Sequence, residues 1–354
     1  LDAIGRQRTF SFLGGGETNS TQNQLLVEMD GLKDNDYNVV VIGATNAQES
    51  TLDTALLRPG RFDRKVYIDR PSLEGREQLF QYYLGTIKHD PRMDISRLAR
   101  KCVYKTPADI QNIVKEAALI ASRKGTEIVG HKEISEAIER VDMGIKHRKK
   151  MTPKEKEMVA THESGHLLTM YILHPTNDVF KASIISRKDT LGAVYSQPRE
   201  ELFTANRDQI LANIKVSLGG YAAEKLRFGV TSDGVAQDFK HAMEYAHNMV
   251  WKYGMGKEEF IGDYTVIPPA QLSEATKEAL NNETKKIFQQ CYSEVKLMLK
   301  QETPLLERFV KELLEKEELE YDEIESIFKE YGKNRALPAQ QTSLPDVQTG
   351  LPTV

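Results

Sequence analysis

Cysteine is almost absent from this sequence, since Cys102 and Cys291 are the two present in 354 residues. Two distant cysteines exclude a disulfide framework and a multi-cysteine zinc cluster, and they fit a reducing compartment. No apolar run reaches the roughly 18 residues that a bilayer span requires. Charge of neither sign dominates, because 48 Lys and Arg stand against 52 Asp and Glu, so bulk charge does not favour nucleic-acid binding.

The sequence also lacks a phosphate-binding loop of the G-x-x-x-x-G-K-[ST] type. Gly14, Gly15 and Gly16 form a short glycine run that no such Lys follows, so the run predicts a mobile loop and not a phosphate cradle. The chain begins at Leu1 without a secretory signal pattern. Apolar residues make up 40% of the composition, which is typical of a soluble globular protein, and the length suggests two or three domains.

Residues 1–71 predict part of an α/β unit. Asn23–Leu32 has the apolar content of a helix, and Val39–Ala44 is a largely β-branched apolar run. Such a run is typical of a strand that is buried on both faces. Lys65–Asp69 predicts a second, shorter strand.

Residues 72–146 predict a small bundle of helices. Ser72 is a suitable N-cap residue for the first helix, and Pro107 is placed to open another. His147–Lys150 is a basic stretch without apolar residues, which we interpret as a solvated hinge and not as a nucleic-acid patch.

A new domain is predicted to begin at Thr152. Thr152 is the expected N-cap, Pro153 occupies the first helical position, and Glu155 completes a capping box. This helix is expected to end near His174, before Pro175. The elements expected after it are two short strands, Phe180–Ser186 and Leu191–Ser196, and long helices over Ala205–Phe228, Ala236–Trp251, Glu274–Lys300 and Pro304–Tyr331.

The pattern with the clearest chemistry is His162-Glu163-Ser164-Gly165-His166, inside that helix. Residues four apart lie one turn apart on the same face of a helix, so both imidazoles can reach one metal ion. The pattern predicts a zinc site, in which the metal lowers the pKa of a bound water to about 7. Glu163 is predicted to take the proton of that water, which attacks a peptide carbonyl, and to deliver the proton to the leaving amine.

A catalytic zinc ion usually has three protein ligands and one open position, so a third ligand is needed. Spacing along the chain leaves its identity open. Glu224 and Asp238 are the local candidates, and His241 and His247 are weaker ones.

At these residues the sequence resembles the FtsH family of membrane-anchored, ATP-dependent zinc proteases. H-E-S-G-H is similar to the family's H-E-A-G-H, Gly219–Glu224 looks like its G-G-R-x-A-E, and Ser232–Asp238 is similar to its T-G-A-x-N-D segment. The resemblance implies that Asp238 is the third zinc ligand. It also implies that Glu224 is a carboxylate that orients a ligand histidine.

The amino-terminal part resembles the same family. Asn23–Gly31 is close to the family sequence, Ala44-Thr45-Asn46 is similar to the end of an AAA+ sensor strand, and Leu52–Arg64 resembles the second region of homology of AAA proteins. The resemblance implies that Asn46 helps to position the attacking water near the γ-phosphate. It also implies that Arg58 and Arg61 are arginine fingers, which would act on the nucleotide of a neighbouring subunit.

Two further segments carry the resemblance. Thr106-Pro107-Ala108-Asp109 stands where the family's helical lid has S-G-A-D, and Pro107 removes a backbone N–H from this turn. Leu191–Tyr195 looks like the family's edge strand beside the active helix, and such an edge could bind substrate by strand addition.

The resemblance implies a fold class: an α/β remnant of an AAA+ core plus a helical lid, followed by a mainly α-helical zinc metalloprotease domain. The expected domains are residues 1–71 for the carboxy-terminal portion of the AAA+ core, 72–146 for the lid, 147–151 for a linker, 152–333 for the FtsH-type zinc peptidase and 334–354 for a disordered tail. The family's Walker A loop and membrane anchors would precede Leu1.

The function that the resemblance implies is that of a zinc metalloendopeptidase coupled to an AAA+ ATPase. The protein would unfold and degrade membrane and soluble proteins, including unfolded or damaged ones, as a homo-hexamer or with related subunits, in protein quality control. It would hold one Zn²⁺ per subunit, with ATP and Mg²⁺ bound in the full-length protein. It would be membrane-anchored with its catalytic part on the cytoplasmic or organelle-interior side, this fragment being soluble and binding no nucleic acid.

The alternative is a proteolytically silent FtsH-like subunit that serves in assembly or as a chaperone. It rests on three departures from the family pattern, at Ser164, Tyr221 and Pro107. None of these departures removes a predicted ligand or the predicted base, so the peptidase is the preferred hypothesis.

Overall fold

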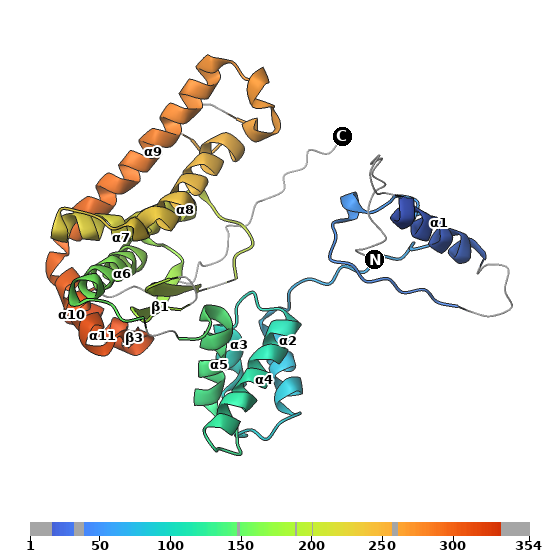
Figure 1. Cartoon of the computed structure of the whole chain (residues 1–354), viewed down its shortest axis with the longest axis horizontal. Coiled ribbons are helices and arrows are strands. Elements are labelled where there is room, and N and C mark those ends of the chain that lie inside the picture. The colour runs from blue at the N-terminus through green and yellow to red at the C-terminus, as the bar shows by residue number, and fades with distance from the viewer. Residues whose placement is uncertain are drawn as a thin grey trace, which may run out of the picture. The chain divides into compact units, whose positions relative to one another are not determined.

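The computed structural model describes residues 16–31, 39–146, 149–187, 190–199, 201–256 and 261–333. The chain divides into two compact units, residues 1–69 and residues 70–354 (Figure 1). The predicted tail at 334–354, the predicted loop at Gly14 and Gly15, and part of the predicted hinge lie outside the described residues. Within the described residues, no helix combines the length and the apolar character that a membrane span needs.

The first unit contains helix α1 (Gly16–Gly31) and a short 3-10 turn, η2 (Glu49–Thr51). Helix α1 confirms the helix predicted over Asn23–Leu32, although it begins earlier. The buried amide of Gln22 donates a hydrogen bond to Asp53, at 3.0 Å, and so ties α1 to the later segment. The buried hydrophobic side chains described in this unit are Leu26, Met29, Leu52 and Leu56.

The strand predicted at Val39–Ala44 is wrong, and so is the one at Lys65–Asp69. Both segments are irregular, and their apolar side chains are exposed, with Ile42 and Ile68 each 89% accessible. A β-branched run becomes a buried strand only if neighbouring strands accept its hydrogen bonds and other elements cover its faces. Within the described part of this unit, neither segment has such a neighbouring strand.

The second unit begins with a helical bundle, as predicted. Its helices are α2 (Leu73–Leu84), α3 (Ile95–Lys101), α4 (Pro107–Arg123) and α5 (His131–Met143). Ser72 is the N-cap of α2 and accepts the N–H of Gly75, and Pro107 opens α4 behind a capping box of Thr106 and Asp109. Side chains at helical spacing meet in one core that includes Phe80, Leu84, Leu98, Ile110, Ile113 and Ile134.

The rest of this unit packs helices around a small sheet. Its helices are α6 (Pro153–Leu173), α7 (Arg207–Phe228), α8 (Ala236–His247), α9 (Glu274–Gln301), α10 (Thr303–Lys316) and α11 (Tyr321–Glu330). Short turns are the 3-10 segments η3 (Asp233–Val235), η5 (Tyr264–Val266) and η6 (Pro269–Gln271), and the π-helical turn η4 (Asn248–Lys252). The strands are β1 (Asn177–Ser183), β2 (Ala193–Pro198) and β3 (Glu318–Glu320).

The three strands form an antiparallel sheet in the order β2-β1-β3. In its register, Ala182 of β1 lies opposite Val194 of β2 and Leu319 of β3. The two strands predicted after the first helix of this domain are therefore confirmed, with ends shifted by a few residues. Strand β2 lies at an edge of this sheet.

The single helix predicted over Pro304–Tyr331 is wrong. It divides into α10, β3 and α11, because Glu317 adopts a left-handed conformation with φ 65° and ends α10. The backbone N–H of Ile184 then donates to the carbonyl of Glu317, and the next residues pair with β1. The continuous apolar pattern of the two helices hid this short strand.

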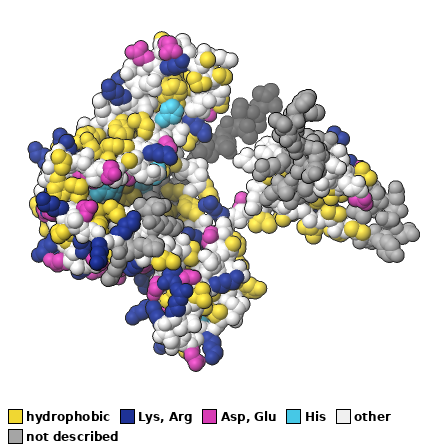
Figure 2. All heavy atoms as spheres, viewed as in Figure 1, with side chains coloured by type: hydrophobic (Ala, Val, Ile, Leu, Met, Phe, Trp, Pro, Cys, Tyr) yellow, Lys and Arg dark blue, Asp and Glu magenta, His cyan; other side chains and the backbone are white. Residues whose placement is uncertain are grey.

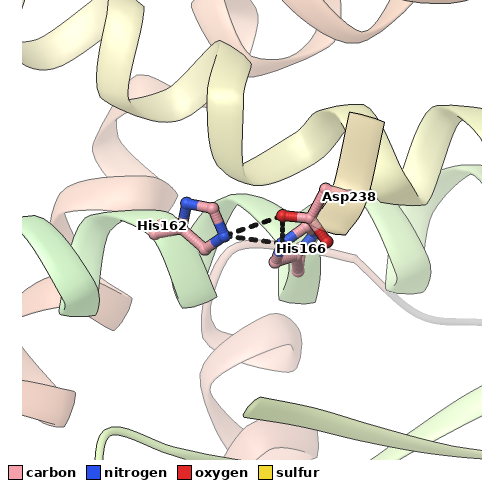
Figure 3. Close-up of side chains that lie close together, drawn as sticks. All are labelled: His162, His166 and Asp238. Atoms are coloured by element: carbon pink, nitrogen blue, oxygen red, sulfur yellow. Dashed lines mark hydrogen bonds and ion pairs between the residues drawn. The ribbon is translucent and has the colours of Figure 1, made fainter. Parts of the chain in front are cut away.

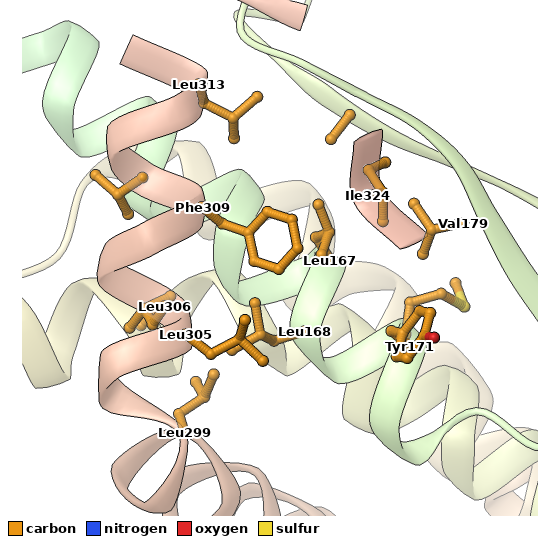
Figure 4. Packing of buried hydrophobic residues seen from close by; sticks show 14 of the residues in the cluster. Leu167, Leu168, Tyr171, Val179, Leu299, Leu305, Leu306, Phe309, Leu313 and Ile324 are labelled. Atoms are coloured by element: carbon orange, nitrogen blue, oxygen red, sulfur yellow. The ribbon is translucent and has the colours of Figure 1, made fainter. Parts of the chain in front are cut away.

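The hydrophobic core of residues 153–330 surrounds α6 (Figure 4). Leu167 and Leu168 of α6 lie beside Phe309 of α10, and Tyr171 stacks on Phe328 of α11 with ring centroids 3.5 Å apart. Helices α10 and α11, which are far from α6 in the sequence, therefore pack against its carboxy-terminal half. The capping box of Thr152 and Glu155 starts this helix as predicted.

Helices α6 and α7 approach each other closely at two glycines. A Cβ atom built on Gly165 of α6 would lie 2.3 Å from the carbonyl oxygen of Gly219 in α7. A Cβ atom on Gly219 would in turn lie 2.6 Å from the carbonyl oxygen of Gly165. Since real Cβ contacts are never this short, both positions require glycine at the present spacing of the helices.

A charged cluster lies where β1 and β3 pair. Lys181 of β1 is buried and its ammonium group contacts Glu320 at 2.7 Å and Glu139 of α5 at 2.9 Å. Glu318 accepts from Arg187 at 2.9 Å and also pairs with Lys146. Elsewhere, on the face shown in Figure 2, side chains of both signs are interspersed.

Gly165→Ala is expected to lower the free energy of unfolding by about 2 kcal/mol, because the added methyl group forces the two helices apart. Urea unfolding followed by circular dichroism would measure the change. Gly75→Ala in α2 is the control for a milder contact, because its Cβ would meet Cβ of Pro71 at 3.2 Å, which a shift of a few tenths of an ångström relieves, and because alanine has the higher helix propensity. Equal stability of Gly165→Ala and wild type would contradict the packing argument.

Glu318→Gln is expected to reduce the acid sensitivity of the fold. Burial alone would raise the pKa of the Glu318 carboxyl, but its bond from Lys146 and the charges of Lys181 and Arg187 lower that pKa to about 2. A lowered folded-state pKa stabilises the protein above the unfolded value, and this stabilisation is lost as the pH falls from about 5 to about 2. Between pH 7 and pH 3 the wild type should lose about 2 kcal/mol more than the variant, measured by urea unfolding at both pH values. Parallel losses in the two proteins would refute this assignment.

Candidate metal centre

Helix α6 carries the two histidines of the sequence pattern on one face. Their Nε2 atoms lie 2.9 Å apart, and Oδ2 of Asp238 lies 3.1 Å from His162 and 3.2 Å from His166 (Figure 3). All three side chains are largely buried but reach solvent in part. Among the described residues, these three form a group that could hold a metal ion.

Asp238 reaches the histidines from the start of α8. It stands in the first turn of that helix, directly after the 3-10 turn η3. A carboxylate in this position is stabilised by the positive end of the helix dipole. Of the residues that spacing had left open as a third ligand, Asp238 is the one whose oxygen meets both imidazoles.

The other ring nitrogen of each histidine has a hydrogen-bond acceptor. Nδ1 of His162 lies 2.7 Å from Oε1 of Glu224, and Nδ1 of His166 lies 2.7 Å from the carbonyl oxygen of Val216. Both acceptors favour a proton on Nδ1, which leaves the lone pair of each Nε2 atom directed at the cluster. Helix α7 supplies both acceptors.

Glu224 is fully buried and is itself held by the loop before α8. It accepts the backbone N–H of Ser232 at 2.6 Å through Oε2 and the hydroxyl of Ser232 at 3.0 Å through Oε1. Burial alone would raise its pKa, but the bonds from His162 and Ser232 lower it. The carboxylate form of Glu224 is therefore favoured beside Nδ1 of His162.

The absence of a side chain at Gly220 leaves room for the imidazole ring of His162. A Cβ atom on Gly220 would lie 2.4 Å from Cε1 of that ring and 2.5 Å from its Nε2. Any other residue here would displace the imidazole, so the glycine is needed by the site and not by backbone strain.

Glu163 belongs to α6, and its buried side chain extends to the backbone just before strand β2. A Cβ atom on Gly192, just before β2, would lie 2.7 Å from Oε1 of Glu163 and 2.8 Å from the carbonyl oxygen of Ser183. The backbone at Gly192 therefore passes directly over the carboxyl group. Burial raises the pKa of Glu163, against the lowering effect of the neighbouring His162 and His166.

The electrostatics of the cluster favour a bound cation. Burial alone would lower the pKa of His162, but its bonds to Asp238 and Glu224 raise that pKa to about 10. Burial would likewise raise the pKa of Asp238, yet the two histidines lower it well below its usual range. Positive charge between these groups is thus strongly stabilised, whether a proton or a metal ion carries it.

The donor set fits a zinc ion. Two imidazole nitrogens and one carboxylate oxygen are the ligands that zinc takes in catalytic sites, where a fourth position stays open. Fixed Nδ1 protons and a buried orienting carboxylate are what such ligands usually require. Cys102 and Cys291 are buried elsewhere and contribute nothing to this set.

The other candidate ligands lie away from the cluster. His241 is exposed and pairs with Gln237, and His247 stacks on Trp251 with ring centroids 4.9 Å apart.

In the first unit, the guanidinium of Arg61 binds both carboxylate oxygens of Asp30, at 2.9 and 2.6 Å. Asn46 and Arg58 are exposed in that unit.

The departures from the family pattern have local structural roles. The buried hydroxyl of Ser164 donates to the carbonyl of Ala160, at 2.7 Å, within α6. Tyr221 packs against Phe239 and Tyr292, with ring centroids 4.9 and 5.5 Å apart. Pro107 occupies the first turn of α4, where its missing N–H costs no helical hydrogen bond.

Sequence reasoning missed three contributors to this site: Val216, Ser232 and Gly192. Val216 acts through its backbone carbonyl, which no side-chain pattern reveals. Ser232 precedes η3 and has the identity of an ordinary N-cap residue, so its bond to Glu224 could not be distinguished from a cap. Gly192 lies in the predicted strand Leu191–Ser196, whose segment Leu191–Tyr195 resembles the family's edge strand, but its close approach to Glu163 was not predicted.

Comparison with known families gives three matches along the chain. The model of peptidase family M41 matches residues 149–327, that of the ATPase family associated with various cellular activities (AAA) matches residues 1–70, and that of the AAA+ lid domain matches residues 92–136. The order of these matches confirms the predicted fold class: AAA and lid segments followed by a mainly helical peptidase.

Curated relatives carry the name ATP-dependent zinc metalloprotease FtsH. The protein of Thermobaculum terrenum is 36% identical over 341 residues, which cover 92% of this chain and 52% of that protein. FtsH 2 of Sorangium cellulosum is 39% identical over 92% of this chain and 56% of its own length, and FtsH of Thermotoga maritima is 37% identical over 93% and 56%. The chain thus spans about half the length of these relatives.

Gly220→Ala is expected to abolish stoichiometric zinc binding, because the methyl group would occupy the position of the His162 ring. Elemental analysis of protein dialysed against zinc would give the stoichiometry. Tyr221→Phe, the neighbouring residue, is the control and should bind zinc as the wild type does. Full zinc occupancy in Gly220→Ala would show that the ring has another position from which it can bind.

Proposed function

Because the chain belongs to the FtsH family, peptidase family M41, we propose that its region 152–333 is a zinc-dependent endopeptidase. His162, His166 and Asp238 would hold the ion, and Glu224 would orient His162. The observation that supports this most directly is the convergence of two Nε2 atoms and one carboxylate oxygen within 3.2 Å, beside the buried Glu163.

A zinc ion in this site would act as a Lewis acid that polarises a peptide carbonyl and acidifies water. Glu163 would accept the proton of the water that attacks the scissile carbonyl carbon. It would then return this proton to the leaving amine nitrogen. The hydrogen bonds of Glu224 and Val216 would keep both imidazoles in the tautomer that the reaction needs.

Substrates would bind as extended chains along β2. The edge position of β2 and the close approach of Gly192 to Glu163 support this. A peptide added there as a further strand would be held by main-chain hydrogen bonds, and its carbonyl groups would pass the carboxyl of Glu163. Recognition through the main chain implies only loose apolar preferences in sequence.

The whole protein would couple this site to ATP hydrolysis. We assign residues 1–71 to the carboxy-terminal portion of an AAA+ core, 72–146 to the lid, 147–151 to a linker and 334–354 to a tail. Asn46 would position the water at the γ-phosphate of ATP–Mg²⁺, and Arg58 and Arg61 would act on the nucleotide of a neighbouring subunit in a homo-hexamer or with related subunits. Rotation of Arg61 away from Asp30 would be required for this role.

In the cell, the protein would unfold and degrade membrane and soluble proteins, chiefly unfolded or damaged ones. The protein would be attached to a membrane, with the peptidase on the cytoplasmic or organelle-interior side. The names of the relatives, of which this chain covers about half, support a protease activity that depends on ATP.

A proteolytically silent subunit is the other reading, and no specific observation favours it. Ser164, Tyr221 and Pro107 each make local contacts that leave the three ligand atoms and Glu163 in place.

Glu163→Gln is expected to lower the cleavage rate of fluorescently labelled casein by about 10²- to 10⁴-fold, because an amide cannot accept the proton of the attacking water. Zinc content, measured by elemental analysis, should stay at the wild-type value. Casein is suitable because it is already unfolded and needs no ATP-driven unfolding. Glu157→Gln, on the same helix, is the control for loss of a carboxylate outside the site.

Undiminished casein cleavage by Glu163→Gln would refute the role of Glu163. A wild-type chain that binds zinc but cleaves nothing, even as a full-length assembly with ATP, would instead support the silent subunit.

A further inference from the structure

Ser232 stands between the two segments that carry the predicted metal ligands. Its backbone N–H and its hydroxyl both donate to Glu224, at 2.6 and 3.0 Å, and Glu224 lies 2.7 Å from Nδ1 of His162. Six residues further along the chain, Asp238 contacts the same imidazole from the opposite side. One residue is therefore linked to His162 by hydrogen bonds and to Asp238 by a short stretch of backbone.

The hydroxyl of Ser232 does not make the N-cap hydrogen bond that its position at the start of η3 suggests. Ser232 is the N-cap of η3, with φ −88° and ψ 171°, yet its side chain makes no capping hydrogen bond. A serine in this position usually accepts a backbone N–H of the following turn. Here the hydroxyl donates to a fully buried carboxylate instead, so the local turn gives up a cap while the site gains a hydrogen bond.

The backbone between Ser232 and Asp238 is short and helical throughout. Turn η3 continues directly into α8, and Val235, at the junction, is buried. A Cβ atom on Gly234 would lie 3.2 Å from the hydroxyl oxygen of Ser232, so the turn closes tightly over that group. A shift of Ser232 would therefore be transmitted to the carboxylate of Asp238.

We propose that Ser232 is a positioning residue of the metal centre. It holds the carboxylate of Glu224 and the segment that carries Asp238 in a fixed position relative to each other. This inference rests on the proposed zinc site. Ser232 touches neither the ion nor the substrate, and it acts on His162 through Glu224 and on Asp238 through the backbone. The chemistry needed at this position is a hydroxyl group together with a backbone N–H.

The test compares Ser232→Thr, which keeps the hydroxyl, with Ser232→Val, which has nearly the shape of threonine without it. Zinc affinity would be measured on the metal-free full chain by competition with a chromogenic chelator. Ser232→Val should bind zinc about 10- to 100-fold more weakly than the wild type, the range typical for loss of a partner of a metal ligand, and Ser232→Thr should be within about threefold. Ser164→Ala, which removes a buried hydroxyl bonded only within α6, is the control and should not differ from the wild type.

Two further measurements separate positioning from general stability. The Tm of the metal-free protein should be equal for the Thr and Val variants, and casein cleavage by Ser232→Val should recover to within about threefold of wild type at saturating zinc, since Glu163 is untouched. In a Glu224→Gln background, Ser232→Val should add less than about threefold, because the two residues act through one contact.

Equal zinc affinity of the Thr and Val variants would overturn the proposal. So would an undiminished effect of Ser232→Val in the Glu224→Gln background, or a loss of affinity that parallels a lower Tm of the metal-free Val variant. If the wild-type chain itself bound no zinc, the proposed peptidase function would fail, and this result is distinct from the other three.

Discussion

The contact between α6 and α7 at Gly165 and Gly219 is the constraint on which the site depends. Because neither glycine has a side chain, the two helices come close enough for α7 to supply both acceptors of the α6 histidines. The same approach brings Gly220 against the ring of His162. Wider spacing would leave two imidazoles on a helix surface without fixed tautomers. The chemistry thus follows from a packing distance as much as from the identity of the ligands.

Much of the candidate site could be predicted from the sequence, because its central part is local. The capping box predicts where the helix begins, and a spacing of four residues predicts that both histidines lie on one face of it. The structure shows both features, with the Nε2 atoms of His162 and His166 2.9 Å apart. The third group could not be derived from spacing, since Glu224 and Asp238 come from other elements and only their tertiary arrangement separates their roles. The carbonyl of Val216 and the hydroxyl of Ser232 were beyond reach for the same reason: they depend on contacts between helices and loops.

The fold was predictable where the periodicity of one element decides it, and not where partners decide it. The helices capped by Ser72 and Thr152, and the helix that Pro107 opens, begin where expected. The prediction of a buried strand at Val39–Ala44 failed because such burial depends on neighbouring strands, which the described residues do not provide. The prediction of one helix over Pro304–Tyr331 failed because a left-handed residue at Glu317 and a three-residue strand do not change an apolar helical pattern.

The pairing of β3 with β1 has a consequence for the order of events during synthesis. Residues 318–320 complete the sheet whose other edge borders Glu163, and α10 and α11 cover the hydrophobic side of α6. A ribosome would release the histidine-bearing helix more than a hundred residues before these partners emerge. Until then α6 lacks the part of its core that α10 and α11 supply, and β1 lacks one neighbouring strand. The newly made chain would therefore carry His162, Glu163 and His166 before the proposed metal centre could assemble around them.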